Sequence, residues 1–102
     1  MAMIAAFLCG NAVALAAAGK VIEQKGKTFS AAEVVIKKGE TITFVNNDNV
    51  THNVMSKSSG NEFNIGAQTP GMSAPVTFGT AGEANILCAI HPQMRMTVKI
   101  GS

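Results

Sequence analysis

Residues 33–48 read EVVIKKGETITFVNND and carry the clearest structural pattern of the chain. The β-branched run over 33–36 predicts a strand, and the Lys-Lys-Gly-Glu that follows it predicts a turn. Beyond the turn, Ile42 and Phe44 alternate with polar threonines, which is the period of a strand with one buried face. An Asn/Asp-rich loop then ends the pattern, so this stretch indicates a β fold.

The same pattern of short strands and turns continues through the rest of the chain. No segment after the first 18 residues shows a sustained helical period, and residues 66–75 are expected to form an irregular loop. Many short strands at close spacing favour an antiparallel sandwich or a small barrel. Parallel pairing is not expected, because the chain leaves no room for crossover helices. The remaining strands are expected within 20–29 and at 50–55, 63–65, 76–78, 83–88 and 94–100.

Length and charge limit the class of protein. A chain of 102 residues makes one domain at most, and its net charge of +2 comes from scattered basic residues. Nucleic-acid binding is disfavoured, because the sequence has no dense basic stripe and contains neither Trp nor Tyr.

The first 18 residues carry no charge and resemble a secretory signal peptide. Residues 3–15 are apolar apart from Gly10 and Asn11, and small residues follow them, as at a cleavage site. We therefore expect residues 1–18 to be removed and residues 19–102 to form a periplasmic domain without stable membrane insertion. An uncleaved anchor is the alternative, but a membrane span needs about 20 apolar residues.

Cleavage would leave Cys88 as the only cysteine of the mature chain. An unpaired thiol in an oxidising compartment must be buried, paired with another chain, reactive, or bound to a metal. Cys88, His91 and Met94 recur three residues apart, and His52 lies on a predicted strand with its side chain toward the core. A thiolate, two imidazoles and a weak thioether form a copper site that suits both Cu(I) and Cu(II).

Each of these residues also has an ordinary structural interpretation. A buried histidine is more often a hydrogen-bonded core residue, and buried Cys and Met side chains usually only fill space. The metal-site hypothesis is favoured because it uses every His and Cys of the mature chain at once.

Three stretches resemble the cupredoxins, the type 1 blue copper proteins related to plastocyanin, amicyanin and pseudoazurin. They are residues 35–48, residues 51–54 and the Cys-x2-His-x2-Met loop at 88–94. The resemblance implies a small antiparallel Greek-key β-sandwich that binds one copper ion and cycles between Cu(I) and Cu(II). By the same resemblance the ligands are His52, Cys88, His91 and Met94.

The resemblance also assigns a supporting role to Asn53. Its backbone N–H is expected to donate to the Cys88 sulfur, and its side chain is expected to tie the two ligand loops together. Met96 competes with Met94 for the axial position, because its spacing from His91 matches that of plastocyanin.

The function implied is that of a monomeric electron carrier rather than an enzyme. It would dock transiently with redox partners such as a cytochrome or a copper oxidoreductase. Three alternatives stay open: a copper-trafficking protein with the same ligands, a thiol enzyme using Cys88 and His91, and a structural zinc site.

Overall fold

The computed structural model describes residues 20–102, so the expected signal peptide at 1–18 lies outside the described residues. Nine strands make up the described part of the chain, and no helix occurs in it. The described residues therefore contain no helix long and apolar enough to span a membrane. The strands are β1 Lys20–Lys25, β2 Thr28–Phe29, β3 Glu33–Lys37, β4 Thr41–Asn46, β5 His52–Ser56, β6 Phe63–Gln68, β7 Ser73–Thr77, β8 Gly82–Leu87 and β9 Arg95–Gly101.

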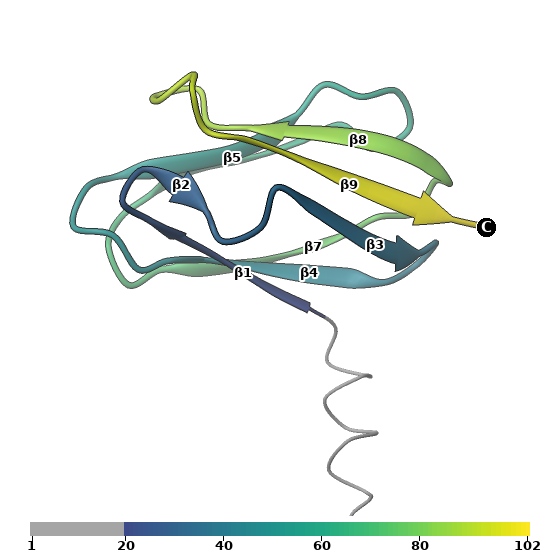
Figure 1. The fold of residues 1–102 in the computed structure, drawn as a ribbon, viewed down its shortest axis with the longest axis horizontal. Helices are drawn as coiled ribbons and strands as arrows, with labels where there is room; N and C mark the ends of the chain where they lie inside the picture. The colour runs from purple at the N-terminus through teal and green to yellow at the C-terminus, as the bar shows by residue number, and fades with distance from the viewer. Residues whose placement is uncertain (1–19) are drawn as a thin grey trace, which may run out of the picture.

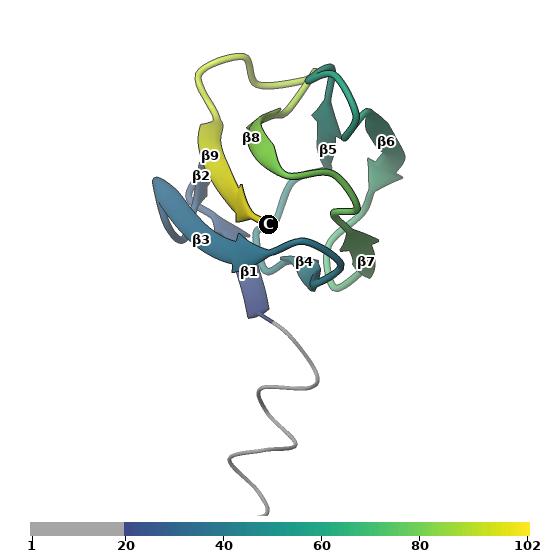
Figure 2. The same ribbon diagram turned by 90° about the vertical axis from the view of Figure 1, so that its right-hand side faces the viewer.

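The strands form two sheets that pack face to face as a β-sandwich (Figures 1 and 2). One sheet has the order β2-β1-β4-β7 and the other has the order β3-β9-β8-β5-β6. Alternate residues of each strand point into the space between the sheets, as the burial of Ile42 and Phe44 in β4 illustrates. The prediction of a small all-β sandwich is thus confirmed.

Two strand pairs correct the expectation that parallel pairing would be absent. β1 pairs with β4 in parallel, and β3 pairs with β9 in parallel. The intervening chain crosses over through the opposite sheet, since β3 lies between β1 and β4 in sequence but belongs to the other sheet. In a sandwich the second sheet thus replaces the crossover helix, and the sequence argument overlooked this route.

The expected loop at residues 66–75 was also wrong in part. β6 continues to Gln68 and β7 begins at Ser73, so only a short turn remains between them. Gly66 has a φ of 78° within β6, and Pro75 lies in β7 at the edge of its sheet. Both are positions where a strand tolerates these residues, because an edge position does not need every ladder hydrogen bond.

The core is apolar through most of its length and becomes polar at one end. Ile42, Phe44, Phe78 and Val98 are fully buried between the sheets. The loops β4–β5, β6–β7 and β8–β9 meet at the other end of the molecule from the C-terminus, on the left of Figure 1. We call this end of the sandwich the loop end, and the residues expected to bind metal lie there.

Candidate metal centre

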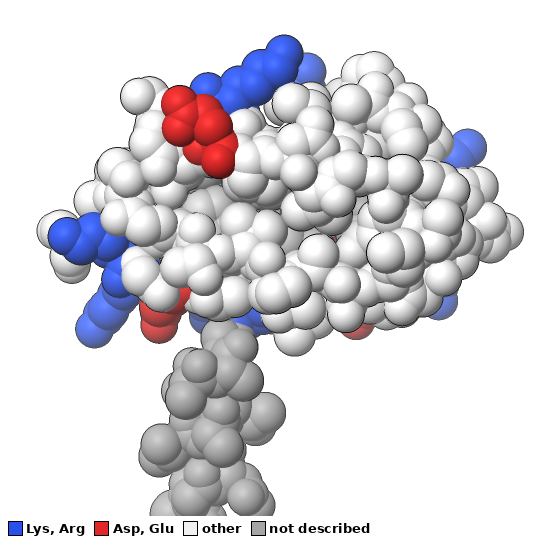
Figure 3. Space-filling view, turned by 180° about the vertical axis from the view of Figure 1, so that it is seen from behind, with Lys and Arg blue, Asp and Glu red and all other residues white. Residues whose placement is uncertain are grey.

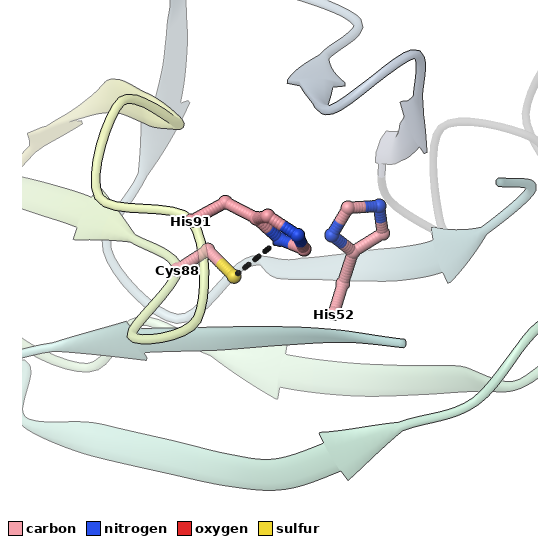
Figure 4. A group of neighbouring side chains, drawn as sticks. All are labelled: His52, Cys88 and His91. Atoms are coloured by element: carbon pink, nitrogen blue, oxygen red, sulfur yellow. Dashed lines mark hydrogen bonds between the residues drawn. The ribbon is translucent and has the colours of Figure 1, made fainter. Parts of the chain in front are cut away.

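His52, Cys88 and His91 come together at the loop end. One ligand atom from each of them lies within 4.8 Å of the other two. His52 opens β5, whereas Cys88 and His91 belong to the loop that follows β8. Figure 4 shows the two imidazole rings and the thiol facing one another, with the Cys88 sulfur 3.7 Å from Nδ1 of His91. The ring centroids of the two histidines are 4.9 Å apart.

His52 presents one nitrogen to this group and the other to a carboxylate. Its Nε2 lies 2.9 Å from Oδ2 of Asp48, and the imidazole is completely buried. A carboxylate can only accept a hydrogen bond, so Nε2 carries a proton, and in the neutral ring Nδ1 keeps its lone pair. Nδ1 is buried without any partner. A lone pair of this kind, buried beside a thiol and a second imidazole, is what a metal ligand requires.

Asp48 is held in place from two further directions. Its Oδ2 also accepts the backbone N–H of Lys27 at 2.9 Å, and its Oδ1 accepts that of Asn49. The hydrogen bond with His52 is the main reason that the pKa of Asp48 falls to about 2, and these two N–H groups lower it further. Asp48 is therefore an anion at neutral pH. Sequence reasoning missed its role, because an aspartate in an Asn-rich loop looks like an ordinary turn residue.

The turn that supplies the Lys27 N–H is conformationally unusual. Gly26 and Lys27 connect β1 to β2, and both have positive φ, at 62° and 58°. Lys27 is the only non-glycine residue in the described chain with a positive φ. Two successive residues of this kind form the tight turn that suits a twisted hairpin. The turn directs the Lys27 N–H toward Asp48 at the cost of a conformation that lysine rarely adopts.

Cys88 is fully buried and receives a hydrogen bond from Asn53. The backbone N–H of Asn53 lies 3.3 Å from the Cys88 sulfur. The Asn53 side chain accepts the N–H of Ala89 at 3.1 Å and donates to Asn64 and to the carbonyl of Gly66. Both hydrogen-bonded contacts expected of Asn53 are present, and they connect the strand of His52 to the loop of Cys88.

Met94 closes the loop that holds Cys88 and His91. Its N–H donates to the carbonyl of His91 at 2.9 Å, and its carbonyl accepts the N–H of Cys88 at 3.3 Å. The residue is 1% exposed. Met96 lies farther along β9, where it is paired with Ile86 of β8 and is also buried. The backbone thus brings Met94, rather than Met96, next to Cys88.

The donor set fits copper better than it fits other common metals. Two imidazole nitrogens and one thiolate in a buried position suit a trigonal copper site, and a thioether is available nearby. Bound copper would supply a one-electron redox couple at this position. The orphaned Nδ1 of His52 is the structural sign that these residues are arranged for a metal.

Comparison with known proteins agrees with this geometry. The sequence model described as copper binding proteins, plastocyanin/azurin family, matches residues 16–101. Amicyanin of Paracoccus versutus is 34% identical over 70 residues, which cover 66% of this chain and 53% of that protein. The chain thus spans about half the length of that relative.

Solved structures show the same fold. A purple cupredoxin from Nitrosopumilus maritimus superposes with a TM-score of 0.72 at 22% identity, covering 80% of this chain and 99% of that one. A copper-containing nitrite reductase from Thermus scotoductus SA-01 gives a TM-score of 0.76 at 23% identity, covering 82% of this chain but 22% of the enzyme. Together with the family match over most of its length, these findings place the chain in the plastocyanin/azurin family of copper-binding proteins.

Proposed function

We propose that this protein binds one copper ion through His52, Cys88 and His91 and carries single electrons between redox partners. The observation that carries the proposal is the unpaired Nδ1 of His52, which is buried within reach of a thiol and a second imidazole. The three side chains converge from β5 and the β8–β9 loop, with one ligand atom of each within 4.8 Å of the others, so that a single metal ion can be held between them.

The residues around the site favour electron transfer over catalysis. Both histidines of the described chain serve as proposed ligands, so neither is available as a general acid or base. Asp48 is engaged by His52 and by two backbone N–H groups. His91 is half-buried, which leaves its ring as the route between the site and the surface.

We assign the fourth, axial position to Met94. Met94 is joined to both Cys88 and His91 through its backbone. Met96 is two residues farther along β9, which amounts to about 6.5 Å. Met96 is paired with Ile86 of β8 and is buried among the core residues.

The surface at the loop end suits transient docking. Ile90 is 51% exposed beside His91, and Met72 is 48% exposed in the β6–β7 turn. Figure 3, which views the sandwich from the side, shows separate basic and acidic side chains and no large patch of one charge. A contact surface without a large charged patch predicts that binding to a redox partner, such as a cytochrome or a copper oxidoreductase, depends weakly on salt. A steep loss of partner binding with salt would contradict this docking surface.

Export and a monomeric state complete the proposal. The charge-free first 18 residues support secretion to the periplasm, and the mass of the protein recovered from that compartment would show whether they are removed.

The test is to titrate the purified mature domain with Cu(II) and record its visible spectrum. A strong blue or purple thiolate-to-copper band at one equivalent is expected, and Cys88→Ser should abolish it. A wild-type protein that stays colourless contradicts the proposal. The alternative is a copper-trafficking protein with the same ligands, which would transfer copper to an acceptor without cycling reversibly between oxidation states.

A further inference from the structure

A layer of buried polar side chains separates the apolar core from the proposed metal site. Gln24 and Asn46 are neighbours at the ends of β1 and β4, and His52 and Gln68 are neighbours at the adjoining ends of β5 and β6. Each of the four is at most 2% exposed. Residues that oppose one another in a ladder place their side chains on the same face, so both pairs point into the sandwich.

Hydrogen bonds connect this layer across the gap between the two sheets. Nε2 of Gln24 donates to Oε1 of Gln68 at 2.6 Å, and Nε2 of Gln68 donates to the carbonyl of Phe44 at 2.9 Å. Gln68 therefore holds two strands of the opposite sheet, β1 and β4. Since Gln68 is the ladder partner of His52, this link fixes the strand end from which His52 projects.

The layer also continues to Asp48. The Asn46 side chain donates to the carbonyls of Gln68 and Val50, and its Oδ1 accepts the N–H of Asp48. A continuous set of contacts therefore leads from Gln24 through Gln68 and Asn46 to Asp48, whose carboxylate bonds Nε2 of His52.

This arrangement is not what stability alone would favour. Oε1 of Gln24 is buried without any partner, and leaving such a group unpaired is costly. Two apolar side chains of similar size at positions 24 and 68 would fill the same space without that penalty. A polar pair in the core can instead specify one arrangement of the elements that it joins.

We propose that the Gln24–Gln68 pair is a positioning device for the metal site, fixing the two sheets relative to each other beside His52. It acts through His52 and Asp48 and touches no metal. The inference rests on the proposed role of His52 as a ligand, but it also predicts a property of the metal-free protein. The hydrogen bond between His52 and Asp48 should weaken when the pair is removed.

The test is the double variant Gln24→Leu/Gln68→Leu, which removes both partners and adds no sulfur near the metal. Its metal-free form should still fold and should unfold at a somewhat lower denaturant concentration than the wild type, because the Phe44 carbonyl loses the Gln68 donor. Exchange of the His52 Nε2 proton, followed by NMR in the metal-free protein, should accelerate at least about ten-fold. Copper affinity should fall about 10- to 100-fold, the usual effect of losing outer partners of a ligand.

The matched control is Thr41→Val/Thr77→Val. This change also replaces both partners of one hydrogen bond, here 2.8 Å long and between β4 and β7, away from the site. It should leave proton exchange and copper affinity unchanged.

Unchanged exchange and unchanged copper affinity in the double leucine variant would overturn the inference, even if the wild type is blue. If the wild type proves colourless, the exchange measurement still decides whether the pair positions His52. Should the double variant fail to fold, Gln24→Leu alone must show the same faster exchange. Failure of both variants to fold would make the pair a general stability element and would also overturn the inference.

Discussion

Replacing Asn53 by alanine should remove the hydrogen bonds that stabilise the site while keeping the hydrogen bond to the Cys88 sulfur. The substitution removes three side-chain hydrogen bonds, with the N–H of Ala89, the side chain of Asn64 and the carbonyl of Gly66. It leaves the backbone N–H of residue 53, which is the group that contacts the Cys88 sulfur. The two roles of Asn53 can thus be tested by one variant.

The expected loss of stability follows from the three bonds. A buried hydrogen bond contributes about 1 kcal/mol net, so the metal-free variant should lose about 3 kcal/mol of unfolding free energy. The loss should not be much larger, because Ala89 is exposed and its N–H can bond water instead. In a domain of this size, about 3 kcal/mol lowers the melting temperature by roughly 12–24 °C.

The colour should respond differently from the stability. Because the N–H to sulfur contact is retained, the copper-loaded variant should keep its charge-transfer band. Copper affinity should fall by at least about ten-fold, because the strand of His52 is no longer tied to the loop of Cys88. Chemical unfolding of the metal-free protein and competition with a copper chelator measure the two effects separately.

Asn61→Ala provides the matched control for Asn53→Ala. Asn61 is also buried and also joins two loops, through contacts of 3.0 and 3.4 Å with the backbone of Thr80, but these loops lie away from the metal site. It should cost about 1–2 kcal/mol and leave copper affinity unchanged. A loss below about 1 kcal/mol in Asn53→Ala, with wild-type copper affinity, would refute the reasoning.

Three further outcomes are expected. Asp48→Asn should lower copper affinity about 10- to 100-fold in chelator competition, because it removes the carboxylate that accepts from His52. The control Glu40→Gln alters a carboxylate that accepts a backbone N–H in the β3–β4 turn and should leave copper affinity unchanged. Equal copper affinities of Asp48→Asn and the wild type would show that Asp48 does not support the site. Met94→Leu should change the visible spectrum and the reduction potential of the copper-loaded protein. Met96→Leu should leave both unchanged and lower the unfolding free energy by under about 1.5 kcal/mol. The opposite result for the two variants would identify Met96 as the axial ligand. Phe44→Ala should cost about 3–5 kcal/mol in chemical unfolding, because this ring is completely buried between the sheets, and a loss below 1 kcal/mol would contradict that packing.

The sequence predicted the strands where one face is apolar and the other is polar. β4 shows this most clearly, since Ile42 and Phe44 alternate with threonines and the strand was found where it was expected. β7 was missed at its start because Ser73, Ala74 and Pro75 carry no apolar alternation. Its position is determined instead by pairing with β4, which is a tertiary contact that local pattern does not record.

The candidate site, like the strands, was predictable from the sequence only in part. Spacing alone indicated the loop of Cys88, His91 and Met94, because residues three apart in a short loop must lie near one another. Nothing in the spacing could place His52 beside them. The chemistry of the complete donor set and the resemblance of residues 51–54 to the cupredoxins pointed to it. The structure then brings these residues together from β5 and from the β8–β9 loop.

The residues that surround the proposed ligands were the hardest to predict, because they come together near His52 only in the folded protein. Asp48 lies in a loop, Lys27 in a hairpin turn and Gln68 at the end of a strand, and none of them is unusual in its local sequence. Gln68 is the ladder partner of His52 within one sheet, but it meets Gln24 only because the two sheets pack together. Lys27 likewise reaches Asp48 from a hairpin of the opposite sheet. A buried amide or carboxylate without a hydrogen-bond partner destabilises the folded protein. A buried polar residue at the end of a strand therefore restricts how the two sheets can pack. The polar layer under the proposed site therefore does two things: it ends the apolar core, and it selects the packing in which Nδ1 of His52 faces Cys88 and His91.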